Sequence, residues 1–153
     1  MPREPSREFL LLARVRRSLR SLNNAIVRGA EAAGLTLQQQ AFLLAIEAYG
    51  GSEVLFADVR EELEMDRATA SLLLRSLMRA GLVSRSRATD RRAFYVSMTK
   101  LGRQRFRESV TRIHAEIRGA DHRDELGALG PDLDRYLAYY RPGRPRDRST
   151  RPR

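Results

Sequence analysis

The sequence contains no cysteine and only two histidines. Without cysteine the chain has no disulfide bonds, no thiolate metal sites and no redox sensing by thiols. No run approaches the roughly 20 apolar residues that a membrane-spanning helix needs. The short apolar run at residues 9–12 lies between acids and arginines, which is not the pattern of a signal peptide. We therefore expect a cytoplasmic protein with no membrane segment.

The sequence also lacks the patterns that accompany catalysis. It has no nucleophile, base and acid in a recognisable arrangement, no glycine-rich phosphate loop and no paired carboxylates at a strand end. His114, Glu116, Asp121 and His122 could form a metal cluster, but they have neither Glu-x-x-His spacing nor the i, i+4 histidine pair of helical zinc sites. We interpret them as solvated helix residues and expect no enzyme, no metal and no cofactor.

The charge of the chain is strongly positive and unevenly placed. A chain of 153 residues is long enough for one domain with a real core, and its net charge is +10. Residues 65–107 carry eleven bases and two acids, whereas residues 29–64 carry one base and seven acids. Lys100 is the only lysine, so an arginine-rich genome would explain the choice of arginine but not the acidic blocks. The placement favours a nucleic-acid partner.

The most informative stretch runs from residue 66 to residue 99. Asp66 is a good N-cap and Gly81 suits a left-handed C-cap, and four apolar residues between them recur at helical spacing: Leu73, Leu74, Leu77 and Met78. Two β-prone runs follow, at 82–83 and 94–98, on either side of a polar, arginine-rich turn. A helix followed by a hairpin with a basic tip predicts a winged helix-turn-helix, with the helix in the major groove and the hairpin at the backbone and minor groove.

The hairpin also carries a specific residue pattern. Its second strand matches Asp-x-Arg-x-x-x-Val-x-Leu-Thr-x-x-Gly, with methionine for leucine, at Asp90, Arg92, Val96, Met98, Thr99 and Gly102. The helix end matches Leu-x-x-x-Gly-Leu-Val at residues 77–83. In these motifs the chain resembles the MarR family (multiple antibiotic resistance regulators), and more loosely it does so from Phe9 to Tyr140. Two features differ: the turn after Val83 is one residue shorter than usual, and Leu72 replaces a residue that is more often polar.

The expected fold class is mainly α with a small β wing. Residues 9–140 would form one MarR-type domain, with a winged helix-turn-helix core at 36–99 and dimerisation helices at 9–33 and 100–140. Residues 1–8 are expected to be a flexible N-terminus, and the basic tail at 141–153 has no apolar anchor and is expected to be disordered.

Several element boundaries follow from local signals. Thr36 with Gln39 forms a capping box for a second helix, whose apolar face we assign to Ala41, Phe42, Leu44, Ala45, Ala48 and Tyr49. A short strand at 54–56 and a helix at 58–64 would precede the recognition helix. Thr99 would cap a long helix, with its buried side at Leu101, Phe106, Val110, Ile113 and Ile117. The polar stretch after Gly119 weakens that helix, and a last short helix would start at Gly130.

The first helix carries a narrow apolar seam: Leu12, Val15, Leu19, Leu22 and Ile26. Such a seam suits packing on a partner subunit or on another helix of the same chain, and by itself it fits both equally. In the MarR family this helix joins the C-terminal helices in a dimer interface. The resemblance therefore implies a homodimer interface that also includes Tyr136 and Tyr140.

Candidate DNA contacts lie on the recognition helix and the wing. Arginine can pair with guanine, and serine or threonine can bond bases or phosphates, so the candidates on the helix are Arg67, Thr69, Ser71 and Arg75. Ala68 and Leu72 could only touch thymine methyl groups or act as spacers. On the wing, alternation places Arg85 and Arg87 on one face, and Arg91 and Arg92 lie at or just past the tip. The resemblance implies that Arg92 enters the minor groove, that Asp66 pairs with it, and that Asp90 helps to order the wing.

The sequence thus predicts a homodimeric transcriptional repressor that binds a pseudo-palindrome of double-stranded DNA. Two alternatives are a winged-helix module that binds a protein, and a sequence-neutral DNA-coating protein. The family also implies a small-molecule effector, in a pocket that would involve Phe42, Ile46 and the helix after Thr99. The same apolar residues fit a plain core equally well in composition, and core is the interpretation we favour.

Overall fold

The computed structural model describes residues 6–89 and 93–140, without the side chains of residues 120–122. The chain divides into two compact units, Asn24–Glu116 and a second that joins Met1–Asn23 to Ile117–Arg153. Helices α1 (Arg7–Ala32) and α5 (Lys100–Arg118) each contribute to both units. Among the described helices, none is both long and apolar enough to cross a membrane.

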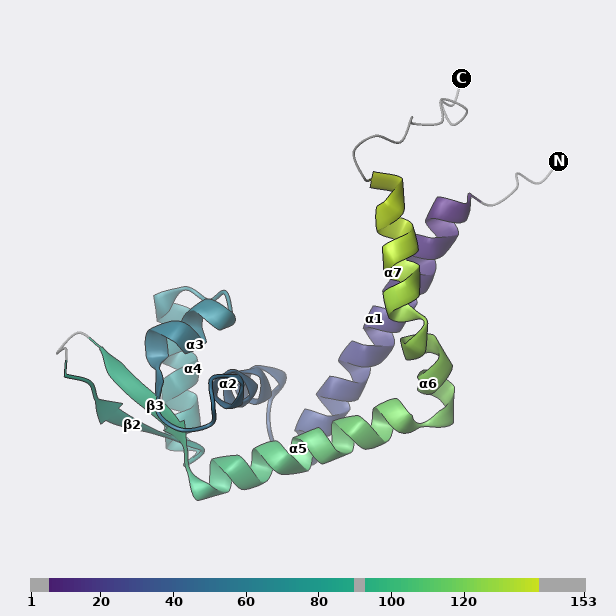
Figure 1. The fold of residues 1–153 in the computed structure, drawn as a ribbon. Coiled ribbons are helices and arrows are strands. Elements are labelled where there is room, and N and C mark those ends of the chain that lie inside the picture. Colours follow the sequence, from purple (N-terminus) through teal and green to yellow (C-terminus); the bar gives the residue numbers. More distant parts are fainter. Residues whose placement is uncertain (1–5, 90–92, 141–153) are drawn as a thin grey trace. The chain divides into compact units, whose positions relative to one another are not determined.

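The unit at 24–116 is a winged helix-turn-helix (Figure 1). Its elements are α2 (Leu37–Ala48), β1 (Val54–Leu55), α3 (Phe56–Glu62), α4 (Arg67–Arg79), β2 (Val83–Arg87) and β3 (Phe94–Met98), with the adjoining parts of α1 and α5. The three strands form an antiparallel sheet in the order β1-β3-β2. The predicted fold class, mainly α with a small β wing, is confirmed.

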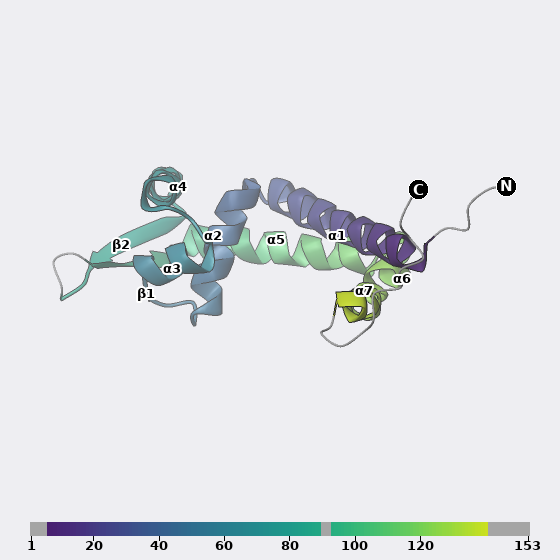
Figure 2. The same ribbon diagram turned by 90° about the horizontal axis from the view of Figure 1, so that it is seen from above.

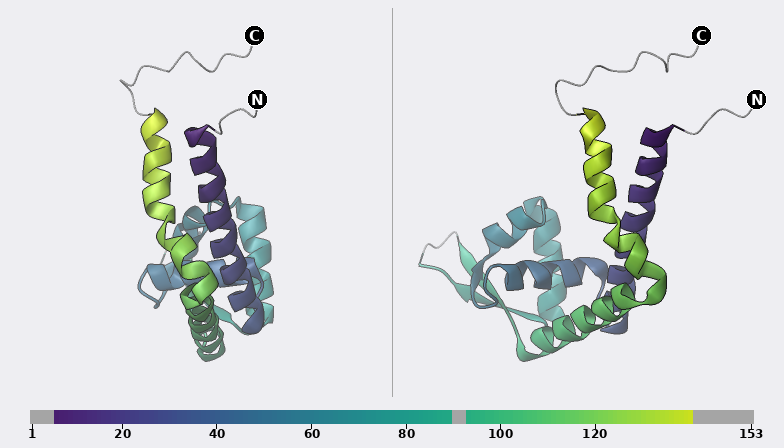
Figure 3. Two further views of the ribbon diagram at one scale, coloured as in Figure 1. Left: turned by 90° about the vertical axis from the view of Figure 1, so that its right-hand side faces the viewer. Right: turned by 45° about the vertical axis from the view of Figure 1, so that its right-hand side comes forward.

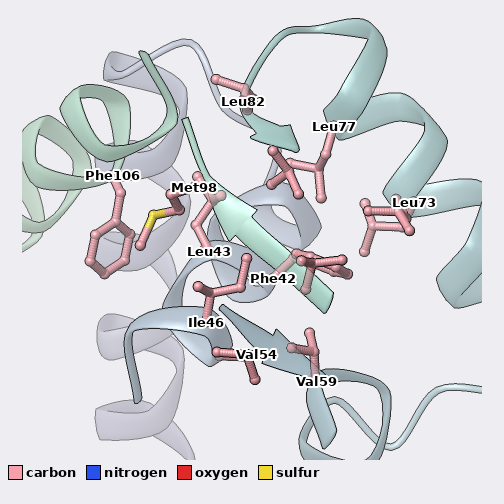
Figure 4. Packing of buried hydrophobic residues seen from close by; sticks show 14 of the residues in the cluster. Phe42, Leu43, Ile46, Val54, Val59, Leu73, Leu77, Leu82, Met98 and Phe106 are labelled. Atoms are coloured by element: carbon pink, nitrogen blue, oxygen red, sulfur yellow. The ribbon is translucent and has the colours of Figure 1, made fainter. Parts of the chain in front are cut away.

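One apolar core holds this unit together (Figure 4). Helix α2 supplies its centre, because Phe42, Leu43 and Ile46 are fully buried. Helix α4 and the sheet close over them, with Leu73, Leu77, Val54 and Met98 around the centre, and Phe106 joins from α5. The expected buried face of α4 is thereby confirmed at Leu73, Leu74 and Leu77, whereas Met78 is 41% exposed.

The helix ends follow the local signals. Thr36 and Gln39 form the predicted capping box at the start of α2. Helix α4 ends with Gly81 at φ 71°, and the next amide, that of Leu82, bonds the Leu77 carbonyl at 2.9 Å, a Schellman motif. Helix α3 ends with the same hydrogen-bonding motif, but there Glu64 holds the left-handed conformation at φ 50°. The turn between the two helices of the motif thus contains a residue that rarely adopts this backbone.

The second unit packs the first part of α1 beside α7 (Leu129–Leu137), as Figure 3 shows in both views. Arg14 bonds the buried carboxylate of Asp132 at 2.9 Å. Ser18 donates to the Glu125 carbonyl at 2.9 Å, which ties α1 to α6 (Ala120–Gly127). A 3-10 turn, η1 (Ala138–Tyr140), ends the described chain. These contacts span more than a hundred residues of sequence and join α1 to α6 and α7 within one unit.

Four boundary or face predictions were wrong. The polar stretch after Gly119 forms α6, which the sequence did not predict. Helix α3 begins at Phe56, so the strand before it is shorter than expected. On α2 the core takes Leu43 and Ile46 while Leu44 is 49% exposed, because residues 41–46 are all apolar and their periodicity cannot select a side. On α5, Leu101 is 41% exposed because Gly102 occupies the inner position.

Candidate nucleic-acid interface

The candidate recognition helix α4 is fixed at its start by Asp66. One oxygen of this carboxylate accepts the backbone N–H groups of Ala68 and Thr69, both at 2.9 Å. The other accepts the Thr69 hydroxyl at 2.5 Å. The hydroxyl bond, followed by the backbone bonds, lowers the pKa of Asp66 below its ordinary value of 3.8. The predicted N-cap is confirmed, and Asp66 is an anion held at the positive end of the helix.

One side of α4 stands clear of the other elements of its unit (Figure 2). The outermost line of this side follows the spacing i, i+4, i+7 and i+11, and it consists of Ala68, Leu72, Arg75 and Arg79, all exposed. Helix α4 contains three arginines and no acid. A helix with this cationic, free side is suited to an anionic groove. Arg79 was not among the predicted contacts, although its spacing of four residues from Arg75 is a signal that could have identified it.

The other predicted contacts of α4 lie beside this line. Ser71 is half-buried, and the Thr69 hydroxyl is already donated to Asp66, so Thr69 could offer a ligand only an acceptor. Arg67 is exposed at the first turn and, with Arg60 of α3, lines a hollow of about 280 Å³ beside Ala93 and Phe94 of the wing. The structure therefore separates Arg75, on the outer line, from Arg67, at the edge nearer the wing.

The wing is an antiparallel hairpin whose two sides differ. Its register pairs Val83 with Met98, Arg85 with Val96 and Arg87 with Phe94, so both arginines share the side on which Val83 and Val96 reach the core. The shared face predicted for Arg85 and Arg87 follows from this register. Farther out both arginines are exposed, and Arg85 covers the Phe94 ring with its guanidinium carbon 3.8 Å from the ring centre.

The opposite side of the wing is lined by hydroxyl groups. Ser84 and Ser97 lie 3.0 Å apart through their hydroxyl oxygens, and Ser86 donates to the carboxylate of Glu53. These bonds link strands β2 and β3 and fasten the wing to the segment before β1. The three residues of the wing tip, Asp90, Arg91 and Arg92, lie outside the described residues, so their predicted roles in ordering the wing and entering the minor groove stay predictions.

The Thr-x-x-Gly end of the wing motif has a structural explanation. Thr99 accepts the Gly102 backbone N–H at 3.0 Å as the N-cap of α5, and its hydroxyl donates to the Gly81 carbonyl at 2.6 Å. A Cβ on Gly102 would lie 1.9 Å from the Leu82 carbonyl oxygen. The Thr-x-x-Gly pattern therefore lets α5 start against the end of α4 and the beginning of β2, which fixes the wing relative to the recognition helix.

The predicted dimer residues belong to the second unit, except for Ile26, which belongs to the unit at 24–116, and they differ in exposure. Leu19 is 50% exposed and Tyr140 is 57% exposed, whereas Leu12, Leu22, Ile26 and Tyr136 are half-buried. Val15 is only 4% exposed, so its own chain already covers its side chain. Tyr140 donates a hydrogen bond to Glu8 and accepts one from Tyr136, and the bond to Glu8 raises the pKa of Tyr140.

Of the four residues with possible metal-ligand side chains, the structure describes the side chains of only His114 and Glu116. Glu116 pairs with Arg28 at 2.8 Å, and His114 is exposed on α5. Within the part of the chain that the structure describes, no three His, Asp or Glu side chains are grouped as a metal site requires. The side chains of Asp121 and His122 lie outside that part.

Comparisons with known proteins agree with this geometry. The MarR family model matches residues 33–93. A Pseudomonas aeruginosa protein has 28% identity and a TM-score of 0.63, over 90% of this chain and 100% of its own. AbsC, a MarR family transcriptional regulator from Streptomyces coelicolor, has 19% identity and a TM-score of 0.63, over 90% and 99%.

A third similar structure contains nucleic acid. It is a variant of S. aureus MepR bound to oligodeoxyribonucleotide, with 20% identity and a TM-score of 0.59, over 90% of this chain and 100% of its own. No curated protein sequence matches this chain. The family-model match covers α2, the helix-turn-helix and the first wing strand, and the solved structures share the fold over most of the chain. By both measures, this chain is similar to winged helix-turn-helix proteins of the MarR family.

Proposed function

We propose that this protein is a homodimeric transcriptional repressor that acts by binding double-stranded DNA. The observation that carries the proposal is the outward side of α4, which is cationic and free of acids. Two such helices, one from each subunit, would enter successive major grooves of a pseudo-palindromic operator, about one helical turn apart. Repression would follow from occupying a promoter. This function places the protein in the cytoplasm with its DNA, and it requires no catalytic chemistry.

Direct base contacts would come from the outer line of α4. Arg75 lies at its middle and is exposed, which suits a bidentate bond to guanine. Arg67, at the first turn beside the wing, is placed for a contact nearer the backbone. Arg87 and the arginines of the wing tip would reach the flanking minor groove, where a narrow groove attracts guanidinium groups.

The dimer is supported by apolar surface on the second unit. A soluble monomer rarely exposes a large group of apolar side chains without a partner. Those exposed here include residues near both ends of the described chain: Phe9, Leu10, Leu19, Leu133, Leu137 and Tyr140. We assign Leu19 to the interface between subunits and Val15 to the packing of its own chain.

An effector site at Phe42 and Ile46 is not part of the proposal. Both side chains are fully buried in the core of the helix-turn-helix, together with Phe106 of α5. A small molecule that released this protein from DNA would have to bind elsewhere or open that core. The core interpretation of these residues is thereby confirmed.

A salt titration on two kinds of DNA tests the proposed function. The DNA would be a sequence selected by the full chain from a random pool, and a scrambled version of the same length. A regulator binds the selected sequence about 10³-fold or more tightly at physiological salt. A DNA-coating protein would show steep salt dependence but equal affinities. A protein-interaction module would bind neither DNA at submicromolar concentration, and either of these results would overturn the proposal.

A further inference from the structure

Leu72 is the most exposed large apolar side chain of the described winged helix-turn-helix unit, at 60%. It lies on the outermost line of α4, between Ala68 and Arg75. The neighbouring Leu73 and Leu74 are buried in the core, whereas Leu72 lies on the opposite, exposed side of α4. The exposed isobutyl group of Leu72 lies at the centre of the outer side of α4. A binding partner would complement it with an apolar group of its own.

The surroundings of Leu72 indicate what kind of partner this is. A protein interface usually surrounds an apolar anchor with further apolar and aromatic side chains. Along the outer line of α4, Leu72 is followed instead by Arg75 and Arg79, and the helix contains no acid to balance them. Charge complementarity therefore favours a strongly anionic partner that also presents isolated apolar groups.

We propose that Leu72 is a specificity-determining residue that recognises the C5-methyl group of thymine in the major groove. This methyl group is the apolar feature on the major-groove edges of the base pairs, and apolar side chains contact it. Arg75, one turn farther along α4, remains free to bond a neighbouring base. The inference rests on the proposed function and deepens it, because it names the chemical group that the middle of the recognition helix reads.

The expected size of the effect follows from the burial of one methyl group. Removing a buried methyl or methylene group changes an equilibrium constant about fourfold. A homodimer on two half-sites would lose this contact twice, which gives about sixteenfold in Kd.

Deoxyuridine provides the test, because it pairs like thymidine but lacks the methyl group. The full chain would select its sequence from a random pool, and that sequence would be amplified with either dTTP or dUTP. Fluorescence anisotropy would give the Kd of both DNAs for the parent, for Leu72→Ala and for Met78→Ala. Met78 is the matched control, since it is an exposed apolar residue of α4 away from the outer line. Both variants keep good helix formers at exposed positions.

We expect the parent and Met78→Ala to bind the uracil DNA about 4- to 16-fold more weakly than the thymine DNA. Leu72→Ala should bind the two DNAs nearly equally. Any general effect of uracil on DNA shape is common to all three proteins, so only the difference between their ratios counts. Equal ratios for the parent and Leu72→Ala would overturn the inference but leave sequence-specific binding intact. Failure to select any sequence would instead overturn the proposed function, and this inference with it.

Discussion

Arg85 lies over the ring of Phe94, with its guanidinium carbon 3.8 Å from the ring centre. On the core side, the Phe94 ring stacks with Phe56 of α3 at 4.8 Å between centroids, and Phe56 in turn lies 6.4 Å from Phe42. A row of three aromatic rings thus runs from the core to the wing and is covered by a cation. Arg85 has an intrachain partner that fixes it, whereas its proposed DNA contact would need it to extend away from the ring.

Arg85→Ala should therefore lower stability more than it lowers DNA affinity. Loss of a cation–π contact at an exposed site costs about 0.5–1 kcal/mol, which urea unfolding would measure. Arg87→Ala is the matched control, because Arg87 is the other exposed arginine of β2. It should leave the free energy of unfolding unchanged and weaken operator binding. The assignment of Arg85 to an intrachain role on the Phe94 ring fails if the two variants show the opposite order in both measurements.

Gly102→Ala should destabilise the winged helix-turn-helix strongly. The new methyl group would lie 1.9 Å from the Leu82 carbonyl oxygen, which belongs to the backbone and cannot rotate away. Overpacking of this kind costs about 1–3 kcal/mol or more in the free energy of unfolding. Gly127→Ala is the control, because a Cβ there meets no atom within 4 Å. An unchanged midpoint of thermal unfolding for Gly102→Ala would contradict the close approach of α5 to Leu82.

The sequence could predict those features of the fold that depend on neighbours along the chain. The capping residues Thr36, Asp66 and Thr99 each bond amides two or three residues ahead, so their pattern is local. The spacing of the wing motif, likewise, reflects one hairpin and the helix that follows it. Helix α6 could not be predicted in this way, because it is tied to Ser18 and Ser21 of α1, about a hundred residues away.

The candidate site was predictable in position but not in the direction of each side chain. Arginines on the outer line of α4 and along β2 follow from periodicity alone. Thr69, by contrast, gives its hydroxyl proton to Asp66, and Arg85 stacks on Phe94. Asp66 and Phe94 are intrachain partners that would compete with the proposed DNA contacts, and residue type and spacing carry no information about which partner prevails.

Replacing Leu19 and Leu22 together by glutamate should dissociate the proposed dimer, or unfold the chain if folding and dimerisation are linked. Leu19 is half-exposed within its own chain, so a charge there is solvated in the monomer but buried in a subunit interface. Sedimentation velocity at micromolar concentration would measure the change in mass. For comparison, Val15→Ala should lower the free energy of unfolding by about 1–3 kcal/mol, since Val15 is buried in the monomer. A monomeric parent protein would refute both the interface and the palindromic operator.

Asp66 should make the stability of the protein depend on pH in the acid range. Hydrogen bonds from Thr69 and Ala68 lower its pKa below 3.8 in the folded state. A group whose folded pKa is lowered contributes stability above its unfolded pKa, and this contribution is lost as the pH falls through the folded value. The difference in unfolding free energy between the parent and Asp66→Ala should thus be full at about pH 7 and shrink below about pH 4. Asp66→Asn keeps a capping oxygen without a titrating group, so it should not show this pH dependence.

The same variant tests whether Asp66 also orders the wing by pairing with Arg92. Long-range electrostatics alone predicts that Asp66→Asn binds operator more tightly, because it removes a negative charge near DNA. Ordering of the wing arginine by a carboxylate predicts weaker binding. Asparagine is also a good N-cap residue, so a change in the DNA affinity of Asp66→Asn would not result from loss of the N-cap of α4. Arg92→Ala should in turn lower affinity more than Arg103→Ala, because Arg103 already lies 3.4 Å from the Gly51 carbonyl within its own chain. Fluorescence anisotropy at physiological salt would measure the operator affinity of Asp66→Asn. Tighter binding than that of the parent would show that the pair of Asp66 and Arg92 does not order the wing. The shortened turn between Val83 and Asp90 would then be the first explanation to test.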